Sequence, residues 1–378
     1  MKKIIRFAIS LCLIVTLMVT ASGCNIGKYA NLDSSKPLIV TTLFPQYDFA
    51  RQLVKDKAEV VLLLSPGVES HDFEPTPSDI ILINKADLFI YTGDEMEPWV
   101  AKILDSIDNK ELTILDVSEG VETICEEENR EHNHVHEENQ VAEDEHIEDD
   151  ETHENEHIED ENAESEHDED GYVDDEHSEG VHEGNIILES DEHAGHDHSH
   201  GADPHIWTSP VNAMKMVENI EKALIEIDSE NASFYEANAY EYIHSLEELD
   251  SQFRRIVKES ASKTIYFGGR FAMAYFAHEY GLNYVAAFDS CQAESEPSAR
   301  LIVKIIDLMR EENVIYIFHE EMIDPKAARI IADEINGEAL LLHSCHNVSK
   351  AEMAAGATYL SLMEKNVENL RKALTINK

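Results

Sequence analysis

Two single histidines stand in loops that proline residues stiffen. His71 lies within P-G-V-E-S-H-D-F-E-P-T-P-S-D at residues 66–79, and His205 lies within A-D-P-H-I-W at residues 202–207. Proline fixes the local backbone, so each imidazole can be held in the single orientation that a metal ligand needs. For either residue alone, a structural loop histidine is the simpler interpretation. The pair, in a chain that also has a histidine-rich tract, favours a metal site.

The histidine-rich tract covers residues 121–200. It contains 33 Asp and Glu, one basic residue and 13 of the 20 histidines of the chain. Closely spaced imidazoles beside carboxylates provide exchanging sites that suit Zn²⁺, Ni²⁺ or Cu²⁺. A solvated spacer whose histidines only titrate is the alternative. We expect the tract to collect metal, chiefly through His132, His134, His136, His193, His196, His198 and His200.

One pattern inside the tract matches that of zinc proteases. Residues 153–157 read H-E-N-E-H, and the H-E-x-x-H motif works where a rigid helix places both histidines on one face beside a glutamate base. The flanking residues here are acidic and polar, so nothing would hold such a helix against a core. We therefore expect no protease activity, and no enzyme.

The net charge of the 378-residue chain is −49, from 29 Lys and Arg against 78 Asp and Glu. The tract alone carries −32, which leaves −17 for the remainder. Nucleic acid is excluded as a partner, because phosphates require a basic surface. Cations are the natural small partners of such a chain.

The N-terminus has the pattern of a bacterial export signal. Three basic residues at positions 2, 3 and 6 precede an apolar run over 7–19, and A-S-G-C follows at 21–24. The last four residues resemble a lipobox, whose cysteine, here Cys24, becomes the lipidated N-terminus. A plain secretory signal with an incidental cysteine is the alternative. We expect a lipid-anchored protein on the outer face of the cytoplasmic membrane.

Short apolar runs alternate with segments of helical periodicity on both sides of the tract. This alternation predicts α/β structure with parallel sheets, in two lobes bridged by a long helix, with the ligand site in the cleft between them. Strands are predicted at 38–43, 59–64, 88–91, 112–117, 264–267, 284–288, 314–318 and 339–342, and helices at 46–55, 78–85, 98–107, 211–227, 234–259, 271–280, 299–311, 325–335 and 351–374.

The predicted domain organisation follows from these elements and from composition. The tract is rich in charge and poor in aromatic residues, so we expect a disordered insertion rather than a third domain. The expected parts are a signal peptide at 1–23, a tether at 24–36, the N-terminal lobe at 37–120, the insertion at 121–202, the end of that lobe with the linking helices at 203–262, and the C-terminal lobe at 263–378.

Two motifs resemble those of the solute-binding lipoproteins of zinc/manganese ABC importers. Residues 67–79 resemble the family's G-x-x-x-H-x-[FY]-E-P-[ST]-P-S-D loop, and residues 203–207 are similar to its D-P-H-x-W motif. Segments 275–282 and 292–299 add weaker matches, so the resemblance covers residues 38–374. It implies two α/β lobes with a metal between them, and zinc members of the family often carry a histidine-rich acidic loop.

The resemblance implies that His71 and His205 are the two metal ligands of the first lobe. The second lobe of the family supplies a His or Glu where this chain has Arg270, and an acidic residue near His343. A guanidinium cannot bind a metal cation. We expect Arg270 to pair instead with Glu296 or Glu320.

Zinc prefers four N, S or O ligands. We expect His71, His205 and His343 to supply three of them, with His346, Glu296 or water as the fourth. Cys345 could also bind as a thiolate. A disulfide between Cys291 and Cys345 is expected instead, because both follow predicted strand ends in one lobe of an exported protein.

The predicted function is capture of Zn(II) and its delivery to a membrane ABC permease by a monomeric receptor. Binding requires deprotonated imidazoles, so it should weaken as pH falls through about 6.5. A manganese or iron receptor of the same family is one alternative, although hard ions prefer oxygen ligands. A surface adhesin or metal-buffering lipoprotein is another.

Overall fold

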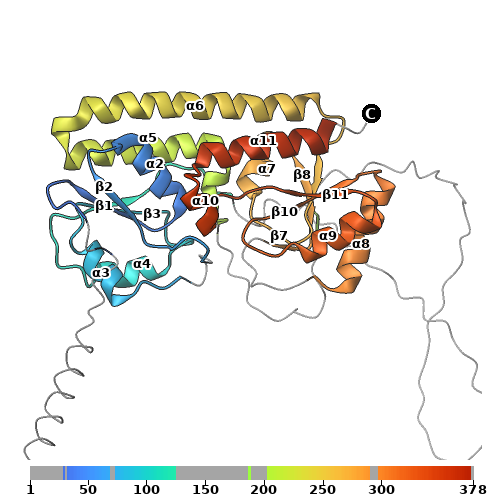
Figure 1. Ribbon diagram of the computed structural model, residues 1–378, viewed down its shortest axis with the longest axis horizontal. Helices are drawn as coiled ribbons and strands as arrows, with labels where there is room; N and C mark the ends of the chain where they lie inside the picture. Colours follow the sequence, from blue (N-terminus) through green and yellow to red (C-terminus); the bar gives the residue numbers. More distant parts are fainter. Residues whose placement is uncertain are drawn as a thin grey trace, which may run out of the picture. The chain divides into compact units, whose positions relative to one another are not determined.

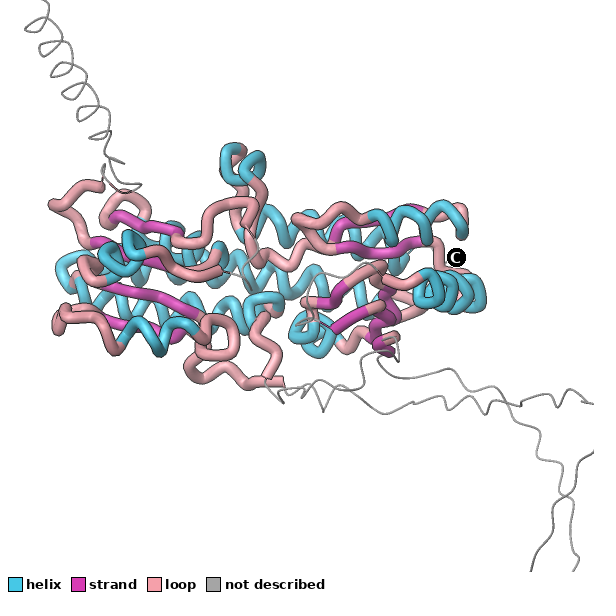
Figure 2. The backbone as a smooth tube through the Cα atoms, turned by 90° about the horizontal axis from the view of Figure 1, so that it is seen from below, coloured by secondary structure: helices cyan, strands magenta, loops and turns pink. Residues whose placement is uncertain are grey.

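A computed structural model describes residues 29, 32–68, 73–124, 186–188, 202–289 and 297–375. These residues form two lobes, each with its own group of strands, and Figures 1 and 2 show the two groups separately. We refer to the lobe formed before the insertion as the N-lobe and to the lobe formed by residues 263–349 as the C-lobe.

The N-lobe is built on a four-stranded parallel sheet of order β2-β1-β3-β4. Its strands are β1 (Leu38–Thr41), β2 (Glu59–Leu62), β3 (Leu88–Tyr91) and β4 (Thr113–Asp116), and its helices are α2 (Phe44–Val54), α3 (Pro77–Ile83) and α4 (Trp99–Leu104).

The two central strands of this sheet are covered on both faces. Ile39 and Ile90 point into one hydrophobic cluster, while Val40 and Phe89 point into another on the opposite face, and all four are fully buried. Burial on both faces explains why these strands are continuous apolar runs rather than alternating ones. The polar residues that follow them therefore gather at one edge of the sheet.

The C-lobe repeats this plan with parallel strands β6 (Thr264–Tyr266), β8 (Asn283–Ala286), β10 (Tyr316–His319) and β11 (Glu338–Leu341). A bridge between Phe267 and Phe318 joins the β6–β8 and β10–β11 pairs. A separate short pair is formed by β7 (Arg270–Phe271) and β9 (Phe288–Asp289), and the helices are α7 (Ala274–Tyr280), α8 (Ala299–Glu311) and α9 (Lys326–Glu334).

A short strand from within the predicted insertion belongs to the C-lobe. Strand β5 (Ile186–Ile187) pairs in parallel with β8, and Leu188 donates its N–H to the carbonyl of Ala286 at 3.0 Å. Leu188 is 4% exposed within the hydrophobic cluster beside α8 and α9. Although we expected residues 121–202 to lie outside both lobes, this segment adds an edge strand, because its apolar side chains find a place in that cluster.

Two long helices contact both lobes, α6 (Ala232–Glu259) and α11 (Tyr359–Thr375), and a third, α5 (Pro210–Ile227), packs against α6 and the N-lobe. Helix α6 packs against α2 and α5 at one end and against α7 and α11 towards the other, as Figure 1 shows. One hydrophobic cluster includes residues of these helices and of both lobes, such as Phe49, Leu249 and Phe276. The predicted α/β fold with two lobes bridged by a long helix is confirmed.

The predicted helix over 351–374 is two helices, α10 (Lys350–Ala354) and α11. The chain turns between them at Gly356, where φ is +76°. A left-handed backbone of this kind suits glycine and ends a helix. Among the described residues, no helix is both long and apolar enough to cross a membrane.

Candidate metal site

Three loops meet where the two lobes face each other. The first follows β2 and leads to His71, the second is the 203–207 segment before α5, and the third follows β11 at residues 343–348. The first and third are joined directly: the Asn347 side-chain amide donates to the carbonyls of Ser65 and Val68, at 2.9 and 2.8 Å. His71 lies outside the described residues. Val68, three residues before it, is hydrogen-bonded to Asn347 of the C-lobe.

His205 is completely buried and is oriented by Asp203. One carboxylate oxygen, Oδ1, lies 2.9 Å from the Nδ1 of His205 and also accepts the His205 backbone N–H at 2.8 Å. A carboxylate at this position fixes the proton on Nδ1. The lone pair is then on Nε2, the nitrogen that a metal ion would bind.

His346 comes from the C-lobe and lies beside His205. The two ring centres are 5.0 Å apart, with the ring planes at 89°. Two imidazoles bound to one tetrahedral zinc at 2.0–2.1 Å have ring centres about 5 Å apart. The two rings are therefore spaced as one zinc ion would require.

Trp207 contacts both of these imidazoles. Its ring centre is 5.5 Å from that of His205 and 5.3 Å from that of His346. Its indole Nε1–H donates to the carbonyl of Ser344 at 2.8 Å. This hydrogen bond joins the loop that carries His346 to the segment that carries His205.

His343, which was predicted as a ligand, lies on the same loop as His346 and has contacts of its own. Its Nδ1 accepts the backbone N–H of Cys345 at 2.9 Å, and its Nε2 lies 3.7 Å from Oε1 of Glu352. Asn366 bonds to both the N–H and the carbonyl of His343, at 2.8 and 2.7 Å. Among the described residues the Nε2 of His343 has no hydrogen-bond partner, and the residue is 1% exposed.

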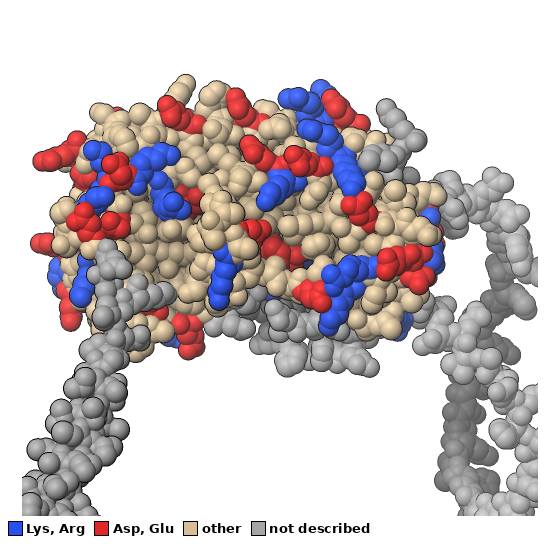
Figure 3. Space-filling view, viewed as in Figure 1, with Lys and Arg blue, Asp and Glu red and all other residues tan. Residues whose placement is uncertain are grey.

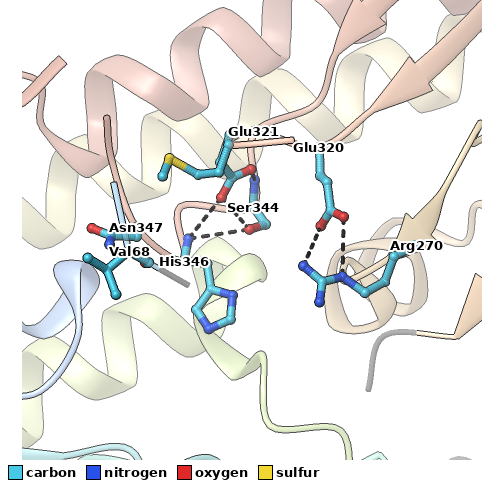
Figure 4. Close-up of a pocket in the computed structure, with 8 residues that line it drawn as sticks. Val68, Arg270, Glu320, Glu321, Ser344, His346 and Asn347 are labelled. Carbon is cyan, nitrogen blue, oxygen red and sulfur yellow. Dashed lines mark hydrogen bonds and ion pairs between the residues drawn. The ribbon is translucent and has the colours of Figure 1, made fainter. Parts of the chain in front are cut away.

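Arg270 pairs with Glu320, one of the two carboxylates expected for it. The Arg270 Nε is 3.2 Å from Oε1 and the Nη2 is 3.4 Å from Oε2, with both side chains about nine-tenths buried. Figure 4 shows this pair in a pocket that it shares with His346 and Glu321. The negative charge of Glu320 compensates the positive charge of Arg270, so the guanidinium can lie beside a candidate cation site.

Cys345 is a free thiol, so the predicted disulfide with Cys291 is not formed. The thiol is completely buried in the shared hydrophobic cluster, and burial raises its pKa well above the ordinary value. A neutral thiol in an apolar environment is a poor metal ligand. The remaining predicted residues lie outside the described part of the chain: Cys24, Cys291, Glu296, His132, His134, His136, His193, His196, His198 and His200.

Asp203, Trp207 and Glu321 complete the surroundings of the two histidines, and we did not predict a role for any of them. A usable signal existed for Asp203, because Asp commonly bonds to the backbone two residues onward. Trp207 is part of the D-P-H-x-W motif, but its contacts with Ser344 and His346, like those of Glu321, join residues far apart in the sequence, and no local pattern encodes them.

The fold and the meeting of these loops between two α/β lobes define the class of two-lobe solute-binding proteins. Residues 39–373 match the family described as zinc-uptake complex component A, periplasmic (ZnuA). The chain belongs to this family. Membership confirms the predicted family and the predicted function class, a substrate-binding component of zinc uptake.

Individual relatives agree with this assignment. The chain is 32% identical to the high-affinity zinc uptake system protein ZnuA of Bacillus subtilis (strain 168), over 98% of this chain and 97% of that protein. It is 31% identical to the zinc-binding protein AdcA of Streptococcus pyogenes serotype M3, over 90% of this chain. The aligned region is 56% of AdcA, so the chain spans little more than half of that relative.

Solved structures show the same fold. The metal-dependent lipoprotein YcdH from Bacillus subtilis superposes with a TM-score of 0.65 at 29% identity, covering 90% of this chain and all of that one. The Zn(II)-bound ZnuA-like domain of Streptococcus pneumoniae AdcA gives 0.64 at 25% identity, covering 90% of this chain and 99% of that one.

Proposed function

We propose that this protein captures Zn(II) between its lobes through His71, His205 and His346, and delivers the ion to a membrane ABC permease. The observation that carries the proposal is the pairing of the His205 and His346 rings at 5.0 Å, one on the 203–207 segment and the other on the loop after β11. A set of imidazoles favours zinc over manganese, which prefers oxygen ligands.

His346 replaces His343 in this proposal. The hydrogen bond from the Cys345 N–H to the Nδ1 of His343 supports a structural role for this histidine in the loop. His71 completes the set because the loop leading to it is bonded to Asn347, the neighbour of His346. The fourth zinc position is open to water or a carboxylate.

No covalent step is needed for this function. The chain binds the ion, holds it between the lobes and releases it at the permease. Because zinc binds the deprotonated imidazole, affinity falls as the solution becomes acidic.

The ligand set is tested by competition titration of zinc against a chromophoric chelator. His205→Ala and His346→Ala should each lose tight binding, and His343→Ala should keep it while unfolding at a lower temperature. His244→Ala is the matched control, since His244 is 61% exposed on α6. Tight stoichiometric binding that survives in the His205→Ala/His346→Ala double variant would exclude the site.

We further propose that Cys24 is lipidated and holds a monomeric protein at the outer face of the cytoplasmic membrane. Tyr29 donates a hydrogen bond to Asp79 on α3 at 2.5 Å, so the predicted tether at 24–36 is attached to the N-lobe near its middle. Five residue steps at about 3.5 Å each then place the lobe within about 20 Å of the lipid. Cys24→Ala should move the protein from the membrane fraction to the medium; retention at the membrane would contradict this.

The histidine-rich tract is proposed to gather zinc near the cleft and so raise its local concentration. Deletion of residues 132–183, which leaves β5 in place, should slow zinc uptake only when zinc is scarce. The affinity of the purified protein for its first zinc ion should not change. Loss of that tight binding on deletion would refute the proposed role.

A further inference from the structure

Glu321 follows β10 and makes three hydrogen bonds to the loop that carries His346. Its Oε2 accepts the backbone N–H of Ser344 at 2.8 Å, and its Oε1 accepts the Ser344 hydroxyl at 2.7 Å and the His346 backbone N–H at 3.3 Å. Figure 4 shows the carboxylate of Glu321 above this loop, with the His346 ring extending away from it. The Glu321 side chain is 7% exposed, so water competes little for these donors.

The loop needs such a support, because it has no regular secondary structure and includes a residue in a left-handed conformation. Cys345, between Ser344 and His346, has φ of +60°, which is unfavourable for a residue with a Cβ. A carboxylate that accepts N–H groups forms stronger hydrogen bonds than a neutral acceptor does. Glu321 therefore offsets the cost of the turn that directs the His346 ring into the cleft.

The same peptide segment is held from its other side. Ser344 receives the Trp207 indole N–H on its carbonyl while its own N–H bonds to Glu321. Trp207 in turn packs against both imidazoles. Glu321, Ser344 and Trp207 thus form a continuous connection from the end of β10 to the 203–207 segment, and this connection sets the position of one imidazole relative to the other.

We propose that Glu321 is a positioning residue for zinc capture, which holds the 344–346 loop so that His346 faces His205 before the ion arrives. This inference rests on the proposed role of His346 as a ligand. Glu321 does not itself bind the ion in this proposal, since its two oxygens are occupied by Ser344 and His346 donors.

The test compares Glu321→Gln with Glu352→Gln in the full-length mature protein. Glu352 is a matched control, because its carboxylate also accepts an N–H and a hydroxyl from one serine, Ser349, at 2.9 and 2.7 Å. Glu321→Gln should weaken zinc binding by about 10- to 100-fold, as loss of a ligand-orienting group commonly does. Glu352→Gln should lower the unfolding temperature of the metal-free protein without this loss of affinity.

Two further measurements separate positioning from the other roles. At saturating Co²⁺, the visible spectrum of Glu321→Gln should equal that of the parent protein, because the ligands are the same; a changed spectrum would make Glu321 a direct ligand and overturn the proposal. Ser344→Ala should weaken zinc binding in the parent protein but should cause no further weakening in the Glu321→Ala variant. If the two substitutions instead reduce the zinc affinity additively, the positioning role of Glu321 is overturned.

These outcomes are distinct from failure of the proposed function. If His346→Ala binds zinc as tightly as the parent, the ligand assignment is wrong. If His346→Ala loses zinc while Glu321→Gln binds it with parental affinity, only the positioning role is wrong.

Discussion

At the scale of single residues, the two facing histidines are held in different ways. His205 is oriented by a carboxylate only two residues away, within one short turn. His346 depends on Glu321 and Trp207, which are 25 and 139 positions distant in the chain. Local motifs can therefore identify His205 as a ligand, but they cannot choose between His343 and His346, which lie three residues apart on a loop that turns at Cys345.

Asp203→Asn tests the local orientation of His205. An asparagine keeps the side-chain shape but removes the charge that stabilises the proton on Nδ1. We expect zinc affinity to fall by about 10- to 100-fold, with little change in the circular dichroism of the metal-free protein. Competition titration measures the affinity, and parental binding by Asp203→Asn would show that the carboxylate does not tune the ligand.

Glu97 is a second residue with an unusual environment, at the edge of the N-lobe sheet. It is almost completely buried, its Oε2 accepts the Thr92 N–H at 3.0 Å, and its Oε1 contacts the Thr42 hydroxyl. That hydroxyl has one proton and also lies 2.8 Å from Oε1 of Gln46. A protonated Glu97 supplies the second proton, and burial raises the pKa of Glu97 to about 8.

The raised pKa makes stability depend on pH. Between about pH 4.5 and pH 8, Glu97 is protonated in the folded protein and ionised in the unfolded chain. The contribution of protonated Glu97 to the free energy of unfolding is therefore full below about pH 4.5 and is lost as pH rises towards 8. Glu97→Gln should remove this slope and be more stable than the parent at pH 8 by roughly 4 kcal/mol. Urea unfolding of the two metal-free proteins at pH 5 and pH 8 measures the difference; parallel curves would contradict it.

At the scale of elements, the long periodic helices and the central strands follow from the sequence, because their apolar spacing matches their burial. Helix α8 and strand β3 begin and end where the pattern predicts. Strand β5 could not be predicted from the sequence, because a two-residue strand inside an acidic segment shows no hydrophobic periodicity. Its only signal is the apolar triplet at residues 186–188, and its partner strand β8 lies about a hundred residues away.

Leu188→Ala tests whether β5 is a true part of the C-lobe. Removing a buried leucine side chain should cost about 2–4 kcal/mol of unfolding free energy. Val303→Ala on α8 is the control, because Val303 is 55% exposed and should change stability little. Chemical denaturation measures both variants, and an unchanged midpoint for Leu188→Ala would show that β5 contributes nothing to the lobe.

At the scale of the whole molecule, the two lobes share one hydrophobic cluster through α6 and α11. A buried carboxylate adds to this connection: Asp48 on α2 accepts the Tyr359 N–H of α11 at 2.8 Å and lies 3.4 Å from the Tyr242 hydroxyl of α6. The strong negative charge of the chain belongs mainly to the tract, and Figure 3 shows acidic and basic side chains intermixed on one face of the described part.

The shared cluster predicts that both lobes unfold together. Calorimetry of the protein lacking residues 132–183 should show one transition, which zinc moves upward in proportion to RT ln(1 + [Zn]/Kd). At 1,000 times Kd this is about 4 kcal/mol. Two transitions, with only one responding to zinc, would show that the lobes are independent.

The contact of Trp207 with both imidazoles also gives the protein an internal optical probe. The chain has only two tryptophans, and the other is Trp99. In a Trp99→Phe protein, all indole emission comes from a ring that lies within 5.5 Å of His205 and His346. Zinc arrival changes the charge beside that ring, so stopped-flow fluorescence would record the rates of capture and release without any attached label.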